Sequence, residues 1–202
     1  MASPVRLAVL GDSIAWGQGA TSPGDRLAAR LAAGLAGHEI EVETRVLAVP
    51  GARSADLGPQ VRHAVTWPPQ VVVMVIGAND LTHLVPLDVA VHALADAVRR
   101  LRAVGAQVVV APAPDLSAVP HVPVMLRPVV QAASAQLRAR QAEVVLRHGG
   151  RVADRDQVAS RAFASDASLF SADRFHPSSS GYAVIASSLL PEVRAAVAAL
   201  GS

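Results

Sequence analysis

The sequence has 202 residues, of which 51% are hydrophobic and only 3% aromatic, and its formal net charge is +2. A chain of this length is most simply one domain over residues 1–202, long enough to bury a sizeable core. Cysteine is absent, which excludes disulfides, thiol catalysis and cysteine-based metal sites. Lysine is also absent, which excludes a P-loop and Schiff-base chemistry.

The basic isoelectric point does not indicate nucleic-acid binding. All 18 basic residues are arginine, which stays protonated up to about pH 12, so a small excess moves the isoelectric point far upward. The one close group, Arg99, Arg100 and Arg102, is expected to form a solvated helix face. The first apolar run is too short for a signal peptide or a membrane span. We therefore expect a cytoplasmic protein with no nucleic-acid partner and no integral membrane segment.

Apolar runs that end at glycine or proline predict five strands, and helical spacing predicts the helices between them. The strands are expected at residues 5–10, 39–49, 71–76, 106–111 and 151–153. The helices are expected at residues 22–36, 56–65, 86–104, 129–147 and 177–200, with Pro191 kinking or splitting the last one. Residues 112–128 contain five prolines and predict an ordered loop, and residues 154–170 predict a helix and a loop.

This alternation of strand and helix predicts an α/β fold, with a parallel sheet covered on both faces in a three-layer α/β/α sandwich. Small residues followed by polar ones come directly after the first three strands. These segments are residues 11–13, 50–54 and 77–80. A fourth polar segment, residues 173–177, precedes the last helix. Since ligands of such sheets bind at the carboxyl edge, we expect a site there.

The residue types in these segments suit acyl transfer, which needs a nucleophile, a base, a group that orients the base, and donors for an oxyanion. Ser13 supplies a hydroxyl on the connection after the first strand. His176 is of the residue type that titrates near neutrality, and Asp173 lies three residues before it. Gly51 permits a close approach of its backbone N–H, and Asn79 offers an uncharged amide donor.

Four short motifs in this order resemble the signature blocks of the GDSL/SGNH hydrolases. Gly11-Asp12-Ser13-Ile14 resembles the first block, with Ile14 in place of the usual leucine. Gly51 corresponds to the second block and Gly77-Ala78-Asn79-Asp80 to the third. Asp173-x-x-His176 resembles the last block. The resemblance spans nearly the whole chain.

The resemblance implies a serine esterase or lipase on a five-stranded, flavodoxin-like parallel sheet. It implies Ser13 as nucleophile, His176 as base and Asp173 as the partner of the histidine. It places the Ser13 N–H, the Gly51 N–H and the Asn79 side chain in an oxyanion hole. It implies no metal and no organic cofactor, and the remaining histidines lack zinc-ligand spacing. The partner is then a small-molecule ester, and no oligomeric state follows.

Two further acids, Asp12 and Asp80, stand beside the predicted site residues and are expected to brace their loops by accepting backbone N–H groups. Two other features leave alternatives open. The segment 112–128 either walls an acyl pocket or packs on the core, and Trp16 either lines the site or packs beneath it. The apolar residues expected in that wall are Leu81, Leu84, Val85, Leu116, Val119, Val122, Val124, Met125 and Leu126.

The favoured function is hydrolysis of carboxylic esters, with short- to medium-chain acyl groups or lysophospholipid-like substrates, through an acyl-enzyme on Ser13. The same residues would also serve a carbohydrate O-acetylesterase or a thioesterase. A distant alternative is a non-enzymatic module that binds a nucleotide or a sugar. Gly17-Gln18-Gly19 supports that module, but the glycine-rich fingerprint of dinucleotide binding is incomplete because Ser22 takes its last position.

Overall fold

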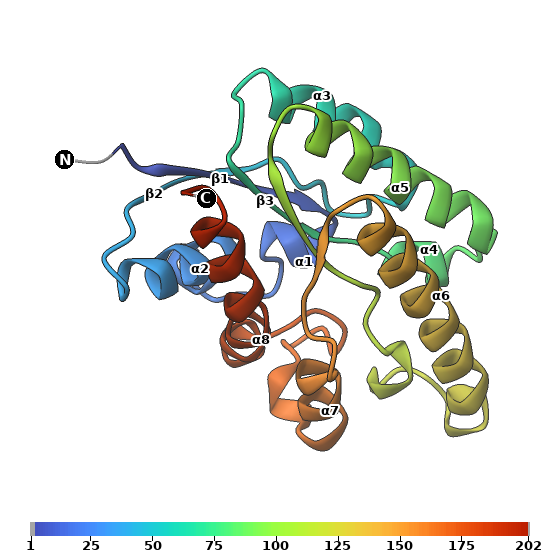
Figure 1. Ribbon diagram of the computed structural model, residues 1–202. Helices are drawn as coiled ribbons and strands as arrows, with labels where there is room; N and C mark the ends of the chain where they lie inside the picture. Colours follow the sequence, from blue (N-terminus) through green and yellow to red (C-terminus); the bar gives the residue numbers. More distant parts are fainter. Residues whose placement is uncertain (1–2, 202) are drawn as a thin grey trace.

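The structure is a computed structural model that describes residues 3–201, with a parallel sheet at its centre (Figure 1). The strands are β1 (Val5–Gly11), β2 (Val42–Val46), β3 (Val71–Val75), β4 (Gln107–Ala111) and β5 (Arg151–Val152). All of them pair in parallel, in the order β2-β1-β3-β4-β5. This is the flavodoxin-like order, so the predicted five-stranded parallel sheet is confirmed.

Helices follow the strands in sequence and cover both faces of the sheet (Figure 1). They are α1 (Ser13–Trp16), α2 (Leu27–Ala36), α3 (Leu57–Val65), α4 (Ala78–Thr82), α5 (Leu87–Ala103), α6 (Arg127–Arg147), α7 (Val158–Ser165) and α8 (Ser179–Ala198). The short helices α1 and α4 begin directly after β1 and β3, where the sequence predicted only polar loops. Among residues 3–201, no helix has the length and the apolar character needed to cross a membrane.

Alternate residues of each strand face opposite layers, and this divides the core in two. Ala8 and Leu10 of β1 belong to a buried cluster with α3, α5 and α6. Leu7 and Val9 of the same strand belong to a second cluster with α2 and α8. Both faces of the central strands are therefore buried, which is why their sequences read as continuous apolar runs.

The helix expected from residue 22 begins later than predicted. A separate 3-10 turn, Pro23–Asp25, precedes α2, and Arg26 between them has extended backbone angles. The Ser22 hydroxyl donates to the Asp25 carboxylate at 2.8 Å instead of capping the turn. Arg30 donates to the other carboxylate oxygen of Asp25 at 2.7 Å. These side-chain contacts fix Asp25 in a network of its own, ahead of the helix.

The other differences lie in the second strand and in the last helix. β2 covers only part of the predicted range because it is an edge strand whose residues are mostly exposed. The last helix, α8, continues through Pro191, so the proline does not split it. The carbonyl that Pro191 leaves without a donor belongs to Ser187, an exposed position that water can reach.

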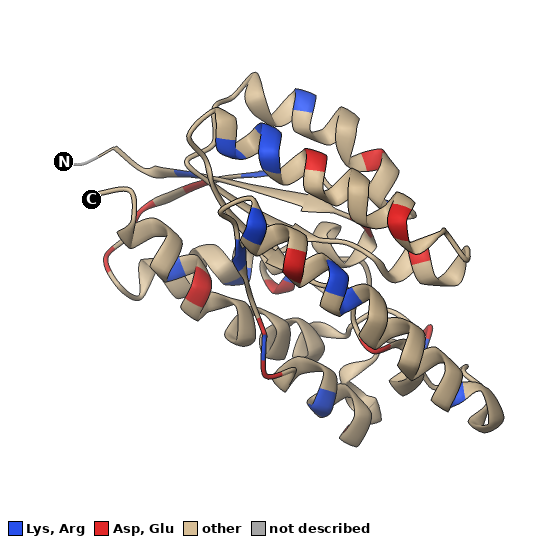
Figure 2. Ribbon diagram, turned by 45° about the vertical axis from the view of Figure 1, so that its right-hand side comes forward, with Lys and Arg blue, Asp and Glu red and all other residues tan. Residues whose placement is uncertain are grey.

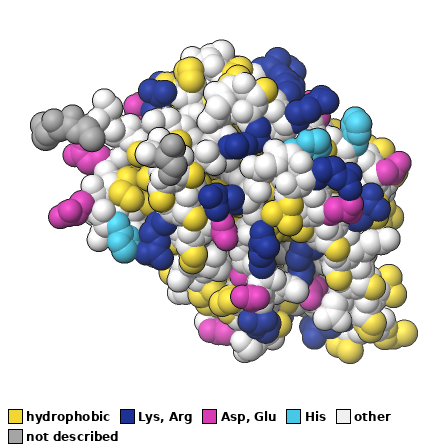
Figure 3. All heavy atoms as spheres, viewed as in Figure 1, with side chains coloured by type: hydrophobic (Ala, Val, Ile, Leu, Met, Phe, Trp, Pro, Cys, Tyr) yellow, Lys and Arg dark blue, Asp and Glu magenta, His cyan; other side chains and the backbone are white. Residues whose placement is uncertain are grey.

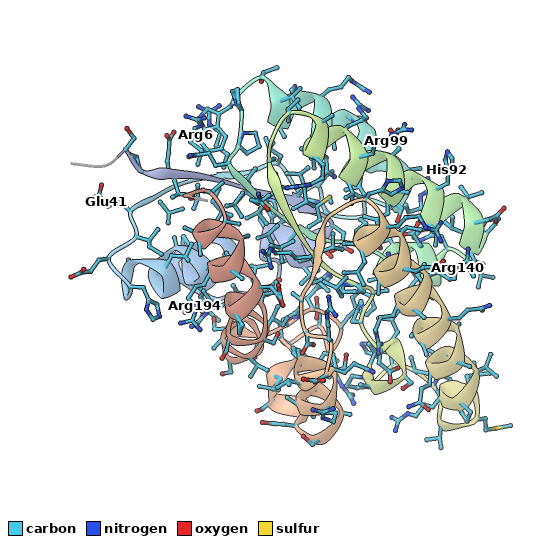
Figure 4. The ribbon with its side chains drawn as sticks, viewed as in Figure 1. Arg6, Glu41, His92, Arg99, Arg140 and Arg194 are labelled. Carbon is cyan, nitrogen blue, oxygen red and sulfur yellow. The ribbon has the colours of Figure 1, made fainter. Side chains whose placement is uncertain are left out.

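The three arginines that are close together in the sequence, Arg99, Arg100 and Arg102, lie on the outer face of α5 and bond to nearby groups. Arg99 and Arg100 both contact the Asp96 carboxylate, at 2.5 and 3.7 Å. Arg102 donates to the carbonyl of Ala106 at 2.9 Å. Figure 4 shows Arg99 and His92 projecting outward from α5, and in Figure 2 the red of acidic residues precedes the blue of the arginines along this helix. Local pairing of this kind is typical of a solvated helix face.

Candidate functional site

The site is built on the sharp connection between β1 and α1. Gly11 ends the strand with φ +130°, and a Cβ at this position would lie 1.9 Å from the Val75 carbonyl oxygen. Only glycine fits so close to β3 in this conformation. Asp12 then caps α1 by accepting the Ile14 N–H at 2.9 Å, and Ser13 is the first helical residue. Because the first N–H groups of a helix have no partner within it, the Ser13 N–H is directed out of the helix.

The structure brings Ser13, His176 and Asp173 together, although 163 residues separate the serine from the histidine. The Nε2 atom of His176 lies 3.0 Å from the Ser13 Oγ. The Nδ1 atom of the same ring lies 2.6 Å from the Asp173 Oδ2. One imidazole therefore contacts the hydroxyl on one side and the carboxylate on the other. Ser13 is 7% exposed, so the residue is largely shielded from solvent.

The turn that carries the imidazole is fixed by the Asp173 carboxylate. Its Oδ1 accepts the backbone N–H groups of Phe175 and His176, each at 2.9 Å, and the Ser171 hydroxyl at 2.8 Å. Partial burial raises the pKa of Asp173, but the hydrogen bonds from His176, Phe175 and Ser171 outweigh it and hold that pKa well below its usual value. The carboxylate is therefore ionised at neutral pH.

Two of the three predicted oxyanion donors come from other segments, Gly51 from a loop tied to the end of β1 and Asn79 from the start of α4. The Val49 N–H donates to the Gly11 carbonyl at 3.0 Å, and Gly51 follows in a tight turn with φ +81°. The Asn79 Nδ2 donates to the Ala52 carbonyl at 3.0 Å, which links the start of α4 to the loop that holds Gly51. A carboxamide has two N–H donors, so one of them is left for a ligand.

The two acids beside these residues accept backbone N–H groups. Asp80 accepts the Ser54 N–H at 3.1 Å and the Ser54 hydroxyl at 2.8 Å, and all three groups are buried. Asp12 is 1% exposed, and its Oδ2 has no hydrogen-bond partner among the described residues. Burial and then the charge of Asp80 raise the pKa of Asp12 to about 7, although the Ile14 N–H opposes this shift.

This shift predicts that Asp12 makes the stability of the protein depend on pH. The pKa of Asp12 is higher in the folded chain, about 7, than its usual value of 3.8, so the folded state binds the additional proton. The contribution of Asp12 to stability is therefore greatest below about pH 4 and is lost as the pH rises to about 7, by up to ~4 kcal/mol. Asp12→Asn should remove this loss and keep the acceptor for Ile14.

Urea unfolding at pH 5 and pH 8 gives the free energy of unfolding of the wild type and of Asp12→Asn. The free energy of the variant should exceed that of the wild type by more at pH 8 than at pH 5. Asp156→Asn, which makes the same chemical change at an exposed position, is the control. If the free energies of unfolding of Asp12→Asn and the wild type differ by the same amount at both pH values, the prediction is wrong.

Two buried glutamines support the site and were not predicted. Gln60 of α3 accepts the Gly11 N–H at 2.7 Å and donates to the Gly11 carbonyl at 2.9 Å. Gln141 of α6 accepts the Ala113 N–H at 2.7 Å and donates to the Ile76 carbonyl at 3.2 Å. Each satisfies backbone groups where a strand ends. A polar amide within the apolar stripe of a helix was the signal available in the sequence.

A cavity of about 100 Å³ adjoins Ser13 and His176. It reaches between the ends of β3 and β4 toward α7 and α8. Its apolar wall includes Val75, Ala111, Leu116, Val119, Phe163, Phe170, Phe175, Ile185 and Leu189. Polar groups also line it, among them Asp115, Arg138, Asp154 and Gln157. The cavity is therefore mostly apolar and begins at the serine hydroxyl.

The segment 112–128 is divided between the two roles expected for it. Leu116 and Val119 line the cavity, whereas Val124, Met125 and Leu126 are exposed and contribute nothing to its wall. The expectation that Leu84 joins the wall is wrong, since this side chain is 88% exposed at the end of α4. Leu81 and Val85 pack on the core instead of lining the cavity.

Trp16 stands outside the cavity, at a surface position. Its ring stacks on the Arg26 guanidinium, whose central carbon lies 4.3 Å from the ring centroid. This cation–π contact orients the ring along the surface of α1. Trp16 therefore neither lines the cavity nor packs beneath the serine.

A parallel sheet of this order, with serine, histidine and aspartate joined at its carboxyl edge, is the architecture of the GDSL/SGNH class of α/β hydrolases. Residues 9–184 match the GDSL-like Lipase/Acylhydrolase family. The chain belongs to this family. It is 37% identical over 199 residues to the GDSL-like esterase Rv1075c of Mycobacterium tuberculosis. That match covers 96% of the chain but 63% of the relative, so the chain spans less than two thirds of its length.

Solved structures share the fold over nearly the whole chain. LAE5, described as an α/β hydrolase enzyme from the metagenome of Lake Arreo, has a TM-score of 0.75 at 21% identity and covers 100% of this chain and 99% of its own. Axe2, an acetylxylan esterase from Geobacillus stearothermophilus, has a TM-score of 0.73 at 18% identity and covers 95% of both chains. At these identities the likeness concerns the fold.

Proposed function

We propose that the protein is a serine esterase that hydrolyses carboxylic esters through an acyl-enzyme on Ser13. The observation that carries the proposal is the pair of contacts on the His176 ring, 3.0 Å to the Ser13 Oγ and 2.6 Å to the Asp173 Oδ2. Such contacts let the imidazole accept the serine proton while the carboxylate fixes its tautomer and orientation. Family membership gives the proposal independent support.

The proposed reaction has two halves. In the first, the Ser13 Oγ attacks the ester carbonyl as its proton passes to the His176 Nε2, and a tetrahedral oxyanion forms. The imidazolium then returns this proton to the leaving alcohol, and the ester carbon stays bonded to the serine. In the second half, His176 takes a proton from water, the hydroxide attacks the acyl-enzyme, and the proton returns to Ser13 as the acid leaves.

The Ser13 N–H, the Gly51 N–H and the free Asn79 N–H are proposed to bind the oxyanion. Removing one donor of this kind costs about 10²–10³ in kcat, and we expect Asn79→Ala to show a loss of this size with little change in KM. Thr82→Ala, on the exposed last turn of the same helix, is the control and should keep wild-type turnover. A loss below about threefold would remove Asn79 from the mechanism.

The cavity supports a short or medium acyl group. A cavity of about 100 Å³ is several times the roughly 10–15 Å³ that holds one water by the same measure, so an acyl chain of a few carbons has room in it. The phenylalanines and leucines of its wall favour an aliphatic chain over a charged one. A carbohydrate O-acetylesterase with the same residues is the second candidate, and the fold shared with Axe2 favours it. A thioesterase remains the third.

Covalent labelling tests the class of function. A fluorophosphonate should modify the protein stoichiometrically at Ser13, and mass spectrometry of the digested protein locates the adduct. An inert serine, together with thermal stabilisation by a nucleotide, would instead favour a binding module. Initial rates on p-nitrophenyl esters of increasing chain length then separate the substrates. Strict preference for acetyl indicates deacetylation of a carbohydrate, whereas a maximum at medium chains indicates a general or lipid-like esterase.

A further inference from the structure

The loop between β4 and α6 ends in an exposed group of four apolar side chains, which we call the apolar tip. Val124, Met125 and Leu126 form a 3-10 turn and are 74%, 90% and 52% exposed. Val129 in the first turn of α6 is 68% exposed. Figure 3 shows hydrophobic side chains gathered at the lower right edge of the molecule, at the end of α6. Contiguous exposed apolar side chains of this kind mark an interaction surface.

The apolar tip stands at the rim of the site. Val122 and Val130, which flank it in sequence, pack with Leu81 and Phe175 around a small buried cluster. Phe175 directly precedes His176, and the two rings contact edge to face at 5.0 Å. The His121 Nε2 lies 2.8 Å from the carbonyl oxygen of Asp173. The base of the tip therefore contacts the turn that carries the proposed base, and its exposed end points away from it.

One basic side chain, Arg127, stands within the apolar tip. The next arginines of α6 are engaged elsewhere, since Arg138 donates to the Ala113 carbonyl and Arg140 pairs with Glu143 at 3.4 Å. Arg127 lies within the tip at an exposed position, and its Nε donates to the Val122 carbonyl at 3.4 Å. In Figure 2 the ribbon of α6 is blue at basic residues toward this end, and its red segment lies toward the other end. The tip therefore combines exposed apolar groups with positive charge.

That combination fits the surface of a lipid aggregate with anionic headgroups, where apolar side chains enter the acyl region and arginines stay among the headgroups. A protein partner fits less well, because one projecting turn supplies much less than the ~800 Å² per partner of a stable interface. We propose that the apolar tip docks the protein on anionic lipid surfaces. Delivery of an ester from that surface to Ser13 rests on the proposed function, whereas docking itself does not.

Vesicle binding tests the docking, and it is measured in the Ser13→Ala background so that no lipid is hydrolysed. The protein should co-sediment with vesicles of phosphatidylcholine mixed with phosphatidylglycerol. Adding Val124→Ser and Met125→Ser should weaken this binding about 10²-fold, because two apolar side chains no longer enter the lipid. Arg127→Gln should weaken it roughly fivefold, and only when the anionic lipid is present.

The matched control replaces two exposed apolar residues elsewhere. Val104 and Leu146 are 50% and 46% exposed, and Val104→Ser with Leu146→Ser should bind vesicles like the parent protein. Failure of the parent to bind, or equal binding by the Val124→Ser, Met125→Ser variant, would overturn the proposal. A third outcome would also overturn it. If the parent protein self-associates in analytical ultracentrifugation, the variant does not, and neither binds vesicles, a second copy of the chain covers the tip.

Hydrolysis separates this proposal from the esterase function. With Ser13 restored, the Val124→Ser, Met125→Ser variant should cleave a dissolved short-chain ester at the wild-type rate and an emulsified ester at least tenfold more slowly. If the wild type cleaves neither ester but binds vesicles, the esterase function fails and the docking stands. If it cleaves the dissolved ester but binds no vesicles, the docking fails alone.

Discussion

Ser13→Ala is expected to lower kcat for a dissolved ester by on the order of 10⁶, because no other hydroxyl within residues 3–201 hydrogen-bonds to the His176 ring. The fold should survive, since the Ser13 hydroxyl hydrogen-bonds to no described residue other than His176. A small residual rate can persist from binding and the oxyanion donors. Initial rates under saturating ester, together with thermal unfolding of both proteins, measure the two expectations.

The control is Ser188→Ala. This hydroxyl donates to the Ile185 carbonyl at 2.8 Å within α8 and contacts none of the proposed site residues. Its variant should keep wild-type turnover. Substantial turnover by purified Ser13→Ala would refute the nucleophile, and a large drop in its melting temperature would leave labelling of the wild type by the fluorophosphonate as the deciding measurement.

Asp173→Asn is expected to lower kcat by about 10⁴, the scale seen when the carboxylate of such a triad becomes an amide. The carboxylate oxygen 2.6 Å from the His176 Nδ1 accepts a hydrogen bond from the N–H at that atom. An amide NH₂ turned toward the same atom would favour the tautomer with its proton on Nε2, which could no longer accept the serine proton. Steady-state kinetics should show the loss in kcat, with a smaller change in KM.

Asp166→Asn supplies a matched control for this change. Asp166 also lies on an exposed turn, accepts the Ser168 N–H at 2.9 Å and the Ser168 hydroxyl at 2.7 Å, and has a lowered pKa because of these hydrogen bonds. Its variant should lose a little stability and no turnover. If both amide variants lose equal turnover, Asp173 acts only through the stability of its turn, and the proposed role is wrong.

Much of the fold follows from local sequence. The strands at residues 71–76 and 106–111 are covered on both faces, so their sequences are almost wholly apolar, and both were predicted to within a residue of β3 and β4. The contact of Asp173 with His176 is also local, because three residues of one turn bring the two side chains together. The edge strand β2 was less predictable, since exposed residues carry no apolar pattern.

The sequence by itself determined the parallel sheet, its layers and the segments at its carboxyl edge, because each depends on the periodicity or the residue types of a short stretch. The tertiary structure alone decided that the Ser13 hydroxyl lies 3.0 Å from His176 and that Gln60 holds Gly11. It also decided that Leu116 lines the cavity while Met125 is exposed, although both lie in one proline-rich loop. The reason is that these contacts join residues far apart in the chain, and only the packing of the helices on the sheet sets which of them meet.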